Sequence, residues 1–449
     1  MSKYFLVIAA LGALTCFHGE GQTAADMTAF KGLAPITLLP NTTEGKAALA
    51  ANFTITGGIQ TGAIKQPTLL PFAEQQEQAL QDAFMTDGNF ADLADGLGTT
   101  LGAGYLAHAH YIDRKQFTNL SQVVSDVIAY AYTTSGMNSN AGKYFFANGT
   151  AGGTKPVSAE ATALLKETGG VTDVYGKSYN LAGGTSGADR YGNSRPFQTE
   201  PNISRFAGPD YFNVPADSDA YNRGPIASYV NSPSFPSGHT TYAYTGALVL
   251  AFLVPQRYEE RIARAAEYGN DRILMGSHYA MDVLAGRTLA LYDMAHLLAN
   301  DPAYIGQTYR GAAAIKDFPA AIKAARVDVT AALQAACGKP IEDCAREDIG
   351  RLSNPAANEA FYAATQTYNL PVVYPSNSNA QEDVGKLAPE AGYLLTAAFP
   401  SLTLEQADRI LTETEGAGGG FLDNGSGFGV YSRLNLYIAG KVAALASGQ

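Results

Sequence analysis

Two of the six histidines in this chain stand among residues that suit an oxyanion. His239 ends the run Pro236-Ser237-Gly238-His239, and His278 belongs to the pattern Arg272-x5-His278-x3-Asp282. An arginine binds two phosphate oxygens at once through its planar fork and does not lose its charge. The residue types in these two patterns therefore predict a site for phosphate or a similar anion.

Four residues are candidates for binding that anion. Phosphate-ester chemistry depends mostly on positioning and charge neutralisation, and Arg195 and Arg272 suit that role. The Ser237-Gly238 step is expected to open a helix that runs toward Leu250, and the first amides of a helix suit an anion. Gly238 lets the backbone come close to the ligand, and the Ser237 hydroxyl adds a donor.

The remaining candidates are the groups that could move protons or attack phosphorus. His278 and Asp282 are four apart, which on a helix places them on one face. The carboxylate can then accept the Nδ1 proton and leave Nε2 free to attack, while His239 protonates the leaving oxygen. Each motif alone is commoner as a helix-surface hydrogen bond or a turn. Their order and spacing together favour an active site.

With Arg195-Pro196 upstream, these motifs resemble the type 2 phosphatidic acid phosphatase superfamily. That superfamily includes bacterial non-specific acid phosphatases and vanadium haloperoxidases. The resemblance implies an all-α helical bundle and hydrolysis of phosphomonoesters through a phosphohistidine on His278, with His239 as general acid. The same residues fit a vanadium-dependent haloperoxidase or a non-catalytic anion-binding relative, so both alternatives stay open. Vanadate is a cofactor only under the haloperoxidase alternative; otherwise no cofactor is expected.

The chain departs from the pattern of this superfamily at the first motif, which is Lys-x6-Arg-Pro. Ala188 stands where that lysine belongs, and Arg190, two residues later, is the candidate replacement. A second departure is Asp271, which directly precedes Arg272 and could compete with the substrate for it. No carboxylates or cysteines with metal-ligand spacing lie near the motifs, so a metal-free site is expected.

The composition narrows the class of partner. A net charge of −11 argues against nucleic acid and against anionic membrane surfaces as partners. No segment reaches 18 consecutive apolar residues, so no integral membrane span is expected. The resemblance implies a small phosphomonoester substrate as the partner.

The N-terminal segment and the cysteines predict export. Residues 1–25 have the order of a signal peptide, with Lys3 before an apolar run at 5–17 and small and polar residues after it. A periplasmic or secreted protein is therefore expected. In an exported chain, Cys337 and Cys344 are expected to form one disulfide across a short turn-prone stretch.

Helix-like apolar spacing dominates the rest of the chain. Helices are expected over 71–80, 120–132, 159–165, 258–268, 280–298, 312–336 and 403–411. Loops are expected over 133–155, 182–194 and 415–429, which are rich in Gly, Ser and Asn. We predict a catalytic helical domain over 26–310, with a helical extension at 311–449 that packs on it. His108, His110 and His296 are expected to lie outside the active site.

Overall fold

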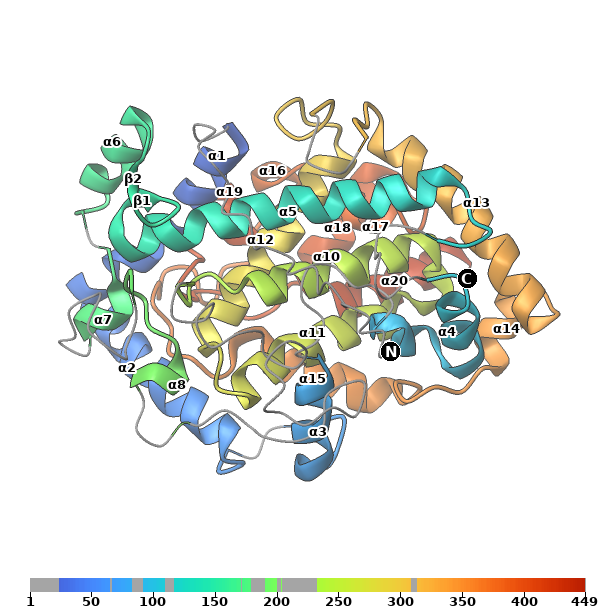
Figure 1. The fold of residues 1–449 in the computed structure, drawn as a ribbon, viewed down its shortest axis with the longest axis horizontal. Coiled ribbons are helices and arrows are strands. Elements are labelled where there is room, and N and C mark those ends of the chain that lie inside the picture. Colours follow the sequence, from blue (N-terminus) through green and yellow to red (C-terminus); the bar gives the residue numbers. More distant parts are fainter. Residues whose placement is uncertain are drawn as a thin grey trace, which may run out of the picture.

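The computed structural model describes residues 24–64, 67–82, 92–109, 117–170, 172–178, 190–199, 203, 232–307 and 313–448. These residues form helices and one short two-stranded ribbon, so the predicted all-α class is confirmed (Figure 1). The predicted signal peptide at 1–25 lies outside the described residues except for its last two positions, which begin the first helix.

The elements follow one another along the chain in two groups. The first group is α1 (Ala24–Leu33), η1 (Ala34–Asn41), α2 (Thr43–Gln60), α3 (Phe72–Asp82), η2 (Asp92–Leu97), α4 (Thr99–Leu106), α5 (Gln122–Asn148), β1 (Thr150–Ala151), β2 (Lys155–Pro156), α6 (Ala159–Glu167), α7 (Val174–Ser178) and α8 (Pro196–Thr199). The second group is α10 (Gly238–Leu253), η3 (Pro255–Arg257), α11 (Tyr258–Leu274), α12 (Ala280–Leu298), α13 (Phe318–Cys337), α14 (Ile341–Glu347), α15 (Pro355–Thr367), α16 (Val384–Leu387), α17 (Tyr393–Thr396), α18 (Leu404–Glu413), α19 (Gly427–Val430) and α20 (Leu436–Ser447).

The helix α10 lies in the middle of the bundle and is packed against α5, α11, α12 and α13 (Figure 1). Nearly all of its side chains are buried, including the apolar run from Ala247 to Leu253. A helix that is apolar on every side must be covered on every side, which explains its central place. Within the described residues, no helix combines the length and apolarity needed to cross a membrane.

The predicted loop at 133–155 is wrong over most of its length, because α5 continues to Asn148. The small residues that suggested a loop are where other segments approach the helix closely. A Cβ on Gly136 would lie 3.1 Å from the Tyr242 ring, and one on Gly142 would lie 3.4 Å from Pro236. Close packing thus outweighs the roughly 1 kcal/mol that each glycine costs a helix.

The C-terminal helices cover several faces of the central ones. The helix α13 packs against α4, α5 and α10, while α15 and α20 pack against α11 and α17 packs against α12. The buried Arg287 of α12 donates to the carbonyl oxygens of Thr365, Gln366 and Ser432, at 3.5, 3.2 and 2.9 Å. These contacts join the C-terminal segments to the helix that carries Asp282. The division of the chain near residue 310 stays a prediction.

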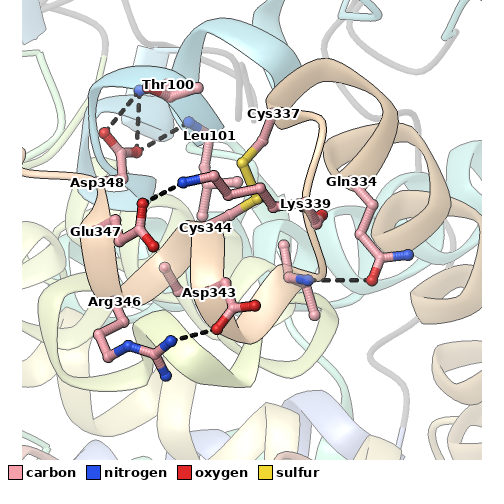
Figure 2. The surroundings of a disulfide bond; sticks show 12 residues. Thr100, Leu101, Gln334, Cys337, Lys339, Asp343, Cys344, Arg346, Glu347 and Asp348 are labelled. Atoms are coloured by element: carbon pink, nitrogen blue, oxygen red, sulfur yellow. Dashed lines mark hydrogen bonds and ion pairs between the residues drawn. A yellow bond between two sulfur atoms is a disulfide. The ribbon is translucent and has the colours of Figure 1, made fainter.

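The predicted disulfide between Cys337 and Cys344 is present and joins the end of α13 to α14 (Figure 2). Close to it, the Asp348 carboxylate accepts hydrogen bonds from the first-turn amides of α4, those of Thr100 and Leu101, at 2.9 and 3.0 Å. The chain-entropy model gives a loop this short a stabilisation of about 2–3 kcal/mol. The bridge and the cap together hold α13, α14 and α4 at one end of the bundle.

Asp293 is a buried carboxyl group between α5 and α12. Its Oδ1 accepts hydrogen bonds from the Asn138 side-chain amide at 2.7 Å and from the Tyr304 hydroxyl at 3.2 Å. Burial raises the pKa of Asp293 to about 8, against 3.8 for an unperturbed aspartate. Between these values the folded state holds a proton that the unfolded state has lost.

The free energy of unfolding should therefore fall as the pH rises from 4 to 8, by about 1.4 kcal/mol per pH unit from Asp293. Asp293→Asn should remove this slope, because asparagine resembles the neutral carboxyl group. Urea unfolding of both proteins at pH 5 and pH 7 checks this: the variant should gain about 3 kcal/mol relative to the wild type. A difference that does not change with pH would show that Asp293 is ionised in the fold.

Candidate active site

The segment that carries His278 connects α11 to α12. Its amide donates to the Arg272 carbonyl oxygen in the last turn of α11, at 3.2 Å. His278 itself precedes the N-cap Tyr279, so it does not share a helix face with Asp282 as predicted. The pair nevertheless forms, with Nδ1 of His278 at 3.3 Å from Oδ2 of Asp282. The carboxylate turns back over the helix start, where it also accepts the Tyr279 amide at 2.8 Å.

Asp282 is held by further donors that the sequence did not reveal. The Tyr175 hydroxyl donates to its Oδ1 at 2.5 Å, and the Ser234 hydroxyl donates to its Oδ2 at 2.5 Å. The side chains of Asp282 and Ser234 are fully buried, and Tyr175 is almost so. These bonds fix the carboxylate, which in turn fixes the imidazole of His278. Tyr175 and Ser234 are therefore positioning residues for this pair.

Arg195 lies against His278 on the other side of the ring. Its Nη1 donates to the Ser277 carbonyl oxygen at 2.9 Å and lies 3.0 Å from Nε2 of His278. Its Nε and Nη2 donate to the carbonyl oxygen and hydroxyl of Ser232, at 3.0 and 3.2 Å. An arginine can only donate, so Nε2 of His278 must accept and the ring proton must lie on Nδ1, toward Asp282. This is the tautomer that a nucleophilic Nε2 requires.

His239 is the part of the site closest to solvent. It is half-buried, whereas Arg195, Arg272, His278 and Asp282 are buried. Its Nδ1 lies 3.4 Å from Nε2 of His278, and the ring centroids are 5.6 Å apart. A group bound at Nε2 of His278 would therefore have His239 beside it on the side that leads outward.

The start of α10 has the geometry expected of an anion site. Ser237 is its N-cap, and its hydroxyl oxygen accepts the amide and the hydroxyl of Thr240 at 3.1 and 2.9 Å. The Ser237 hydroxyl proton remains available as a donor. The amide of Gly238 occupies the first helical position, where amides have no partner inside the helix. The Ser237 amide donates to the Asp282 carbonyl oxygen at 3.1 Å, which ties α10 to α12.

Arg272 brings a second buried guanidinium close to the histidines. Its Nη2 donates to the Ala79 carbonyl oxygen at 3.1 Å, and its Cζ lies 4.5 Å from the centre of the Tyr268 ring. Within the described residues, its Nε and Nη1 have no hydrogen-bond partner. Unpaired buried donors are costly, and an anion would satisfy them. Burial and the charge of Asp82 raise the pKa of Asp271 well above its usual value, so a charged Asp271 competing for Arg272, as the sequence suggested, is not favoured.

The cations around the two histidines dominate the electrostatics of the site. Burial, Arg195 and Lys143 lower the pKa of His278 well below 6.5. Burial, Arg272 and Arg195 lower the pKa of His239 in the same way. Burial also raises the pKa of Asp282, while the bonds from Ser234 and Tyr175 oppose this shift. Without an anion the histidines are therefore held neutral among buried positive charges.

Lys143 is a site residue that the sequence analysis missed. It is buried on α5, and its Nζ donates to the Pro233 carbonyl oxygen at 2.9 Å. The sequence signal was a lysine within a Gly/Ser/Asn-rich stretch, and because that stretch was predicted to be a loop, nothing indicated that Lys143 belongs to the site. Of the two first-motif positions, Ala188 lies outside the described residues, and Arg190 is exposed with its Cζ 5.2 Å from the centre of the Tyr191 ring.

The other histidines have separate surroundings. His108 Nδ1 lies 2.6 Å from the Thr118 carbonyl oxygen, and His110 lies outside the described residues. His296, further along α12 than Asp282, pairs with Asp301 through Nδ1 at 2.7 Å and with Glu390 through Nε2 at 3.4 Å. In the described part of the chain, His108 and His296 thus contact residues that do not belong to the site.

Comparison with known proteins agrees with this site. Residues 180–299 match the PAP2 superfamily. Over 64 residues the chain is 42% identical to a non-specific acid phosphatase of Salmonella typhi and 41% identical to an acid phosphatase of Zymomonas mobilis subsp. mobilis. Over 80 residues it is 35% identical to a lipid A 1-phosphatase of Rhizobium etli. These matches cover 14%, 14% and 18% of the chain and 26%, 24% and 33% of the relatives, so the chain spans about a quarter to a third of their length.

The pKa values of the two site histidines and of His296 should be shifted in opposite directions from that of a free histidine. Since cations and burial lower the pKa of His278 and His239, both should stay neutral below pH 6.5. His296 is the internal control, because Glu390 and Asp301 raise its pKa above 6.5 despite its burial. NMR titration of histidine-labelled protein, assigned with single variants, checks this order. A pKa above 6.5 for His278 would contradict the neutral state described for this residue.

Proposed function

We propose that this protein, whose residues 180–299 match the PAP2 superfamily, is a phosphatase that hydrolyses phosphomonoesters through a phosphohistidine on His278. The observation that carries the proposal is the environment of Nε2 of His278. The Nδ1 proton points to Asp282, and Nε2 faces Arg195 at 3.0 Å and His239 at 3.4 Å. A nucleophile, an anion-binding cation and a proton donor thus meet at one point.

The first chemical step transfers the phosphoryl group to the protein. On binding, a phosphate oxygen replaces Nε2 of His278 as the acceptor for Arg195, which frees the Nε2 lone pair. Nε2 attacks phosphorus, the bond from phosphorus to the ester oxygen breaks, and the leaving oxygen takes a proton from His239. The imidazole becomes positively charged, and the Asp282 carboxylate stabilises it through Nδ1.

The second step returns the protein to its starting state. Neutral His239 takes a proton from water, the water oxygen bonds to phosphorus, and the bond from Nε2 to phosphorus breaks. Arg195, Arg272 and the Gly238 amide stabilise the charge on the phosphate oxygens in both steps. Bound phosphate also offsets the cations that lower the pKa of His239, so the histidine holds its proton when substrate is present.

The proposal also covers the metal requirement, the location of the protein and its substrate. A histidine nucleophile supported by arginines supplies the attack and the charge neutralisation that a metal ion would otherwise provide, so the reaction is proposed to need no metal. The charge-then-apolar order of residues 1–25 and the disulfide support an exported protein, periplasmic or secreted. The proposed substrate is a small phosphomonoester.

Removal of the nucleophile should abolish turnover. His278→Ala should lower kcat by several orders of magnitude, as removal of a covalent nucleophile does elsewhere. His296→Ala, which also removes a histidine paired with carboxylates, is the matched control and should stay near wild type. The assay is release of phosphate from a panel of phosphomonoesters with EDTA present throughout, with the phosphoenzyme trapped by rapid quenching. Wild-type turnover by His278→Ala would refute the nucleophile, and loss of all activity in EDTA would refute the metal-free reaction.

His239 should matter most where the leaving group is a poor one. His239→Ala should lower kcat/KM for alkyl phosphates by about 10²- to 10⁴-fold, because an alkoxide needs the proton. An aryl phosphate such as p-nitrophenyl phosphate should lose far less, because kcat/KM reports only the steps up to the phosphoenzyme. Equal losses on both substrate types would show that His239 has a structural role instead.

A further inference from the structure

We infer that Lys143 supplies the phosphate-binding cation that the first motif of this chain lacks. This inference rests on the proposed phosphatase function. The related pattern places a lysine seven residues before Arg195, where this chain has Ala188. In the structure a lysine instead reaches the site from α5, a helix that begins before the matched region 180–299.

The ammonium group of Lys143 lies near both the start of α10 and the guanidinium group of Arg195. A Cβ built on Gly238 would lie 3.5 Å from Cε of Lys143, so the side chain lies along the start of α10. The Pro233 carbonyl oxygen accepts both Nζ of Lys143 at 2.9 Å and Nη2 of Arg195 at 3.5 Å. The lysine and the arginine therefore flank one oxygen, beside the helix start predicted to bind the anion.

The packing of α5 makes this reach possible. A Cβ on Gly142, next to Lys143, would lie 3.4 Å from the Pro236 ring, and a Cβ on Gly238 would lie 3.4 Å from the hydroxyl oxygen of Ser139, one turn before Lys143. These small residues let α5 approach the run Pro236–His239 closely.

The surroundings of Lys143 also favour an anionic ligand. Within the described residues, Nζ of Lys143 forms no ion pair with a carboxylate, and its hydrogen-bond acceptor is the neutral carbonyl oxygen of Pro233. Burial and the charge of Arg195 lower its pKa, and the charge of Asp282 opposes them. A buried ammonium group that lacks an ion pair is costly, and a phosphate dianion would provide a stronger acceptor than the Pro233 carbonyl. The flexible lysine stem can move Nζ from that carbonyl to a ligand oxygen.

Arg190 is the competing candidate for the missing charge. It is exposed and lies over the Tyr191 ring, which in turn packs edge-on against Tyr144 with centroids 5.3 Å apart. Lys143 is buried beside Gly238 and Arg195, so desolvation strengthens its interaction with an anion. The burial and the contacts both assign the charge to Lys143.

The test measures phosphate binding and turnover separately. Lys143→Met should weaken the binding of inorganic phosphate, measured by calorimetry, by about 10- to 100-fold and should lower kcat/KM by a similar factor. Lys143→Gln keeps a donor for the Pro233 carbonyl and serves if the methionine variant does not fold. Lys155→Met, at an exposed lysine of β2, is the control and should leave both quantities unchanged. Arg190→Ala should change phosphate binding by less than about threefold, since an exposed charge contributes little.

Failure of the inference and failure of the function give different results. A wild type that binds phosphate without hydrolysing any ester would refute the phosphatase and leave Lys143 testable through binding alone. Wild-type phosphate affinity in a folded Lys143→Met or Lys143→Gln protein would overturn the inference. The same conclusion would follow if Arg190→Ala carried the loss instead, or if the wild type bound no phosphate.

Discussion

The carboxylate of Asp282 is the constraint around which the site is arranged. Its side chain accepts hydrogen bonds from Tyr175 and Ser234 and from the Tyr279 amide, and it contacts His278. Its own carbonyl oxygen accepts the Ser237 amide, which fixes the start of α10 relative to α12. One residue thus sets both the tautomer of His278 and the distance between the two motifs. Burial alone would favour a neutral carboxyl group, and these donors favour the charged form that orients an imidazole.

The second determinant is a group of buried cations close to the two histidines. Arg195, Arg272 and Lys143 all lower the pKa of the site histidines. Carbonyl oxygens hold Arg195 and Lys143 in place, and Arg272 keeps donors without partners among the described residues. Buried cations are costly to the fold, and a bound dianion would offset that cost. Under the proposed function, the same cations are already in place for the negative charge of the transition state.

Helices far from the motifs in sequence make this arrangement rigid. The small residues of α5 allow the close contact that brings Lys143 beside Gly238. The C-terminal segments close the opposite side through Arg287, whose guanidinium binds three of their carbonyl oxygens. Because α12 carries both Arg287 and Asp282, these contacts restrain the helix that positions the carboxylate. The segments beyond residue 310 also pack against α5, α10 and α11, so they contact all four long helices around the site, although none of the site residues named above comes from them.

Much of the site followed from local sequence. The order and spacing of Arg195, His239, Arg272, His278 and Asp282 indicated an anion site, because each motif is short and its residues are fixed by one helix end or one turn. The apolar periodicity likewise predicted the bounds of α12 and the start of α11, and the capping box at Thr403 predicted the start of α18. His278 and Asp282 are in contact, as their spacing predicted, but the reason differs. The N-terminal cap of α12, and not a shared helix face, brings them together.

Only the tertiary structure decided which distant groups complete the site. Tyr175, Ser234 and Lys143 come from segments whose composition predicts no site, and Gly/Ser/Asn content alone made residues 133–148 look like a loop. Those residues form a helix because α10, the Pro236 turn and the Tyr242 ring pack where side chains are missing. Helix propensity is a local quantity of at most about 1 kcal/mol per residue, whereas close packing depends on partners that are distant in sequence. Packing therefore placed Lys143 beside Arg195, and no short sequence motif indicates such packing.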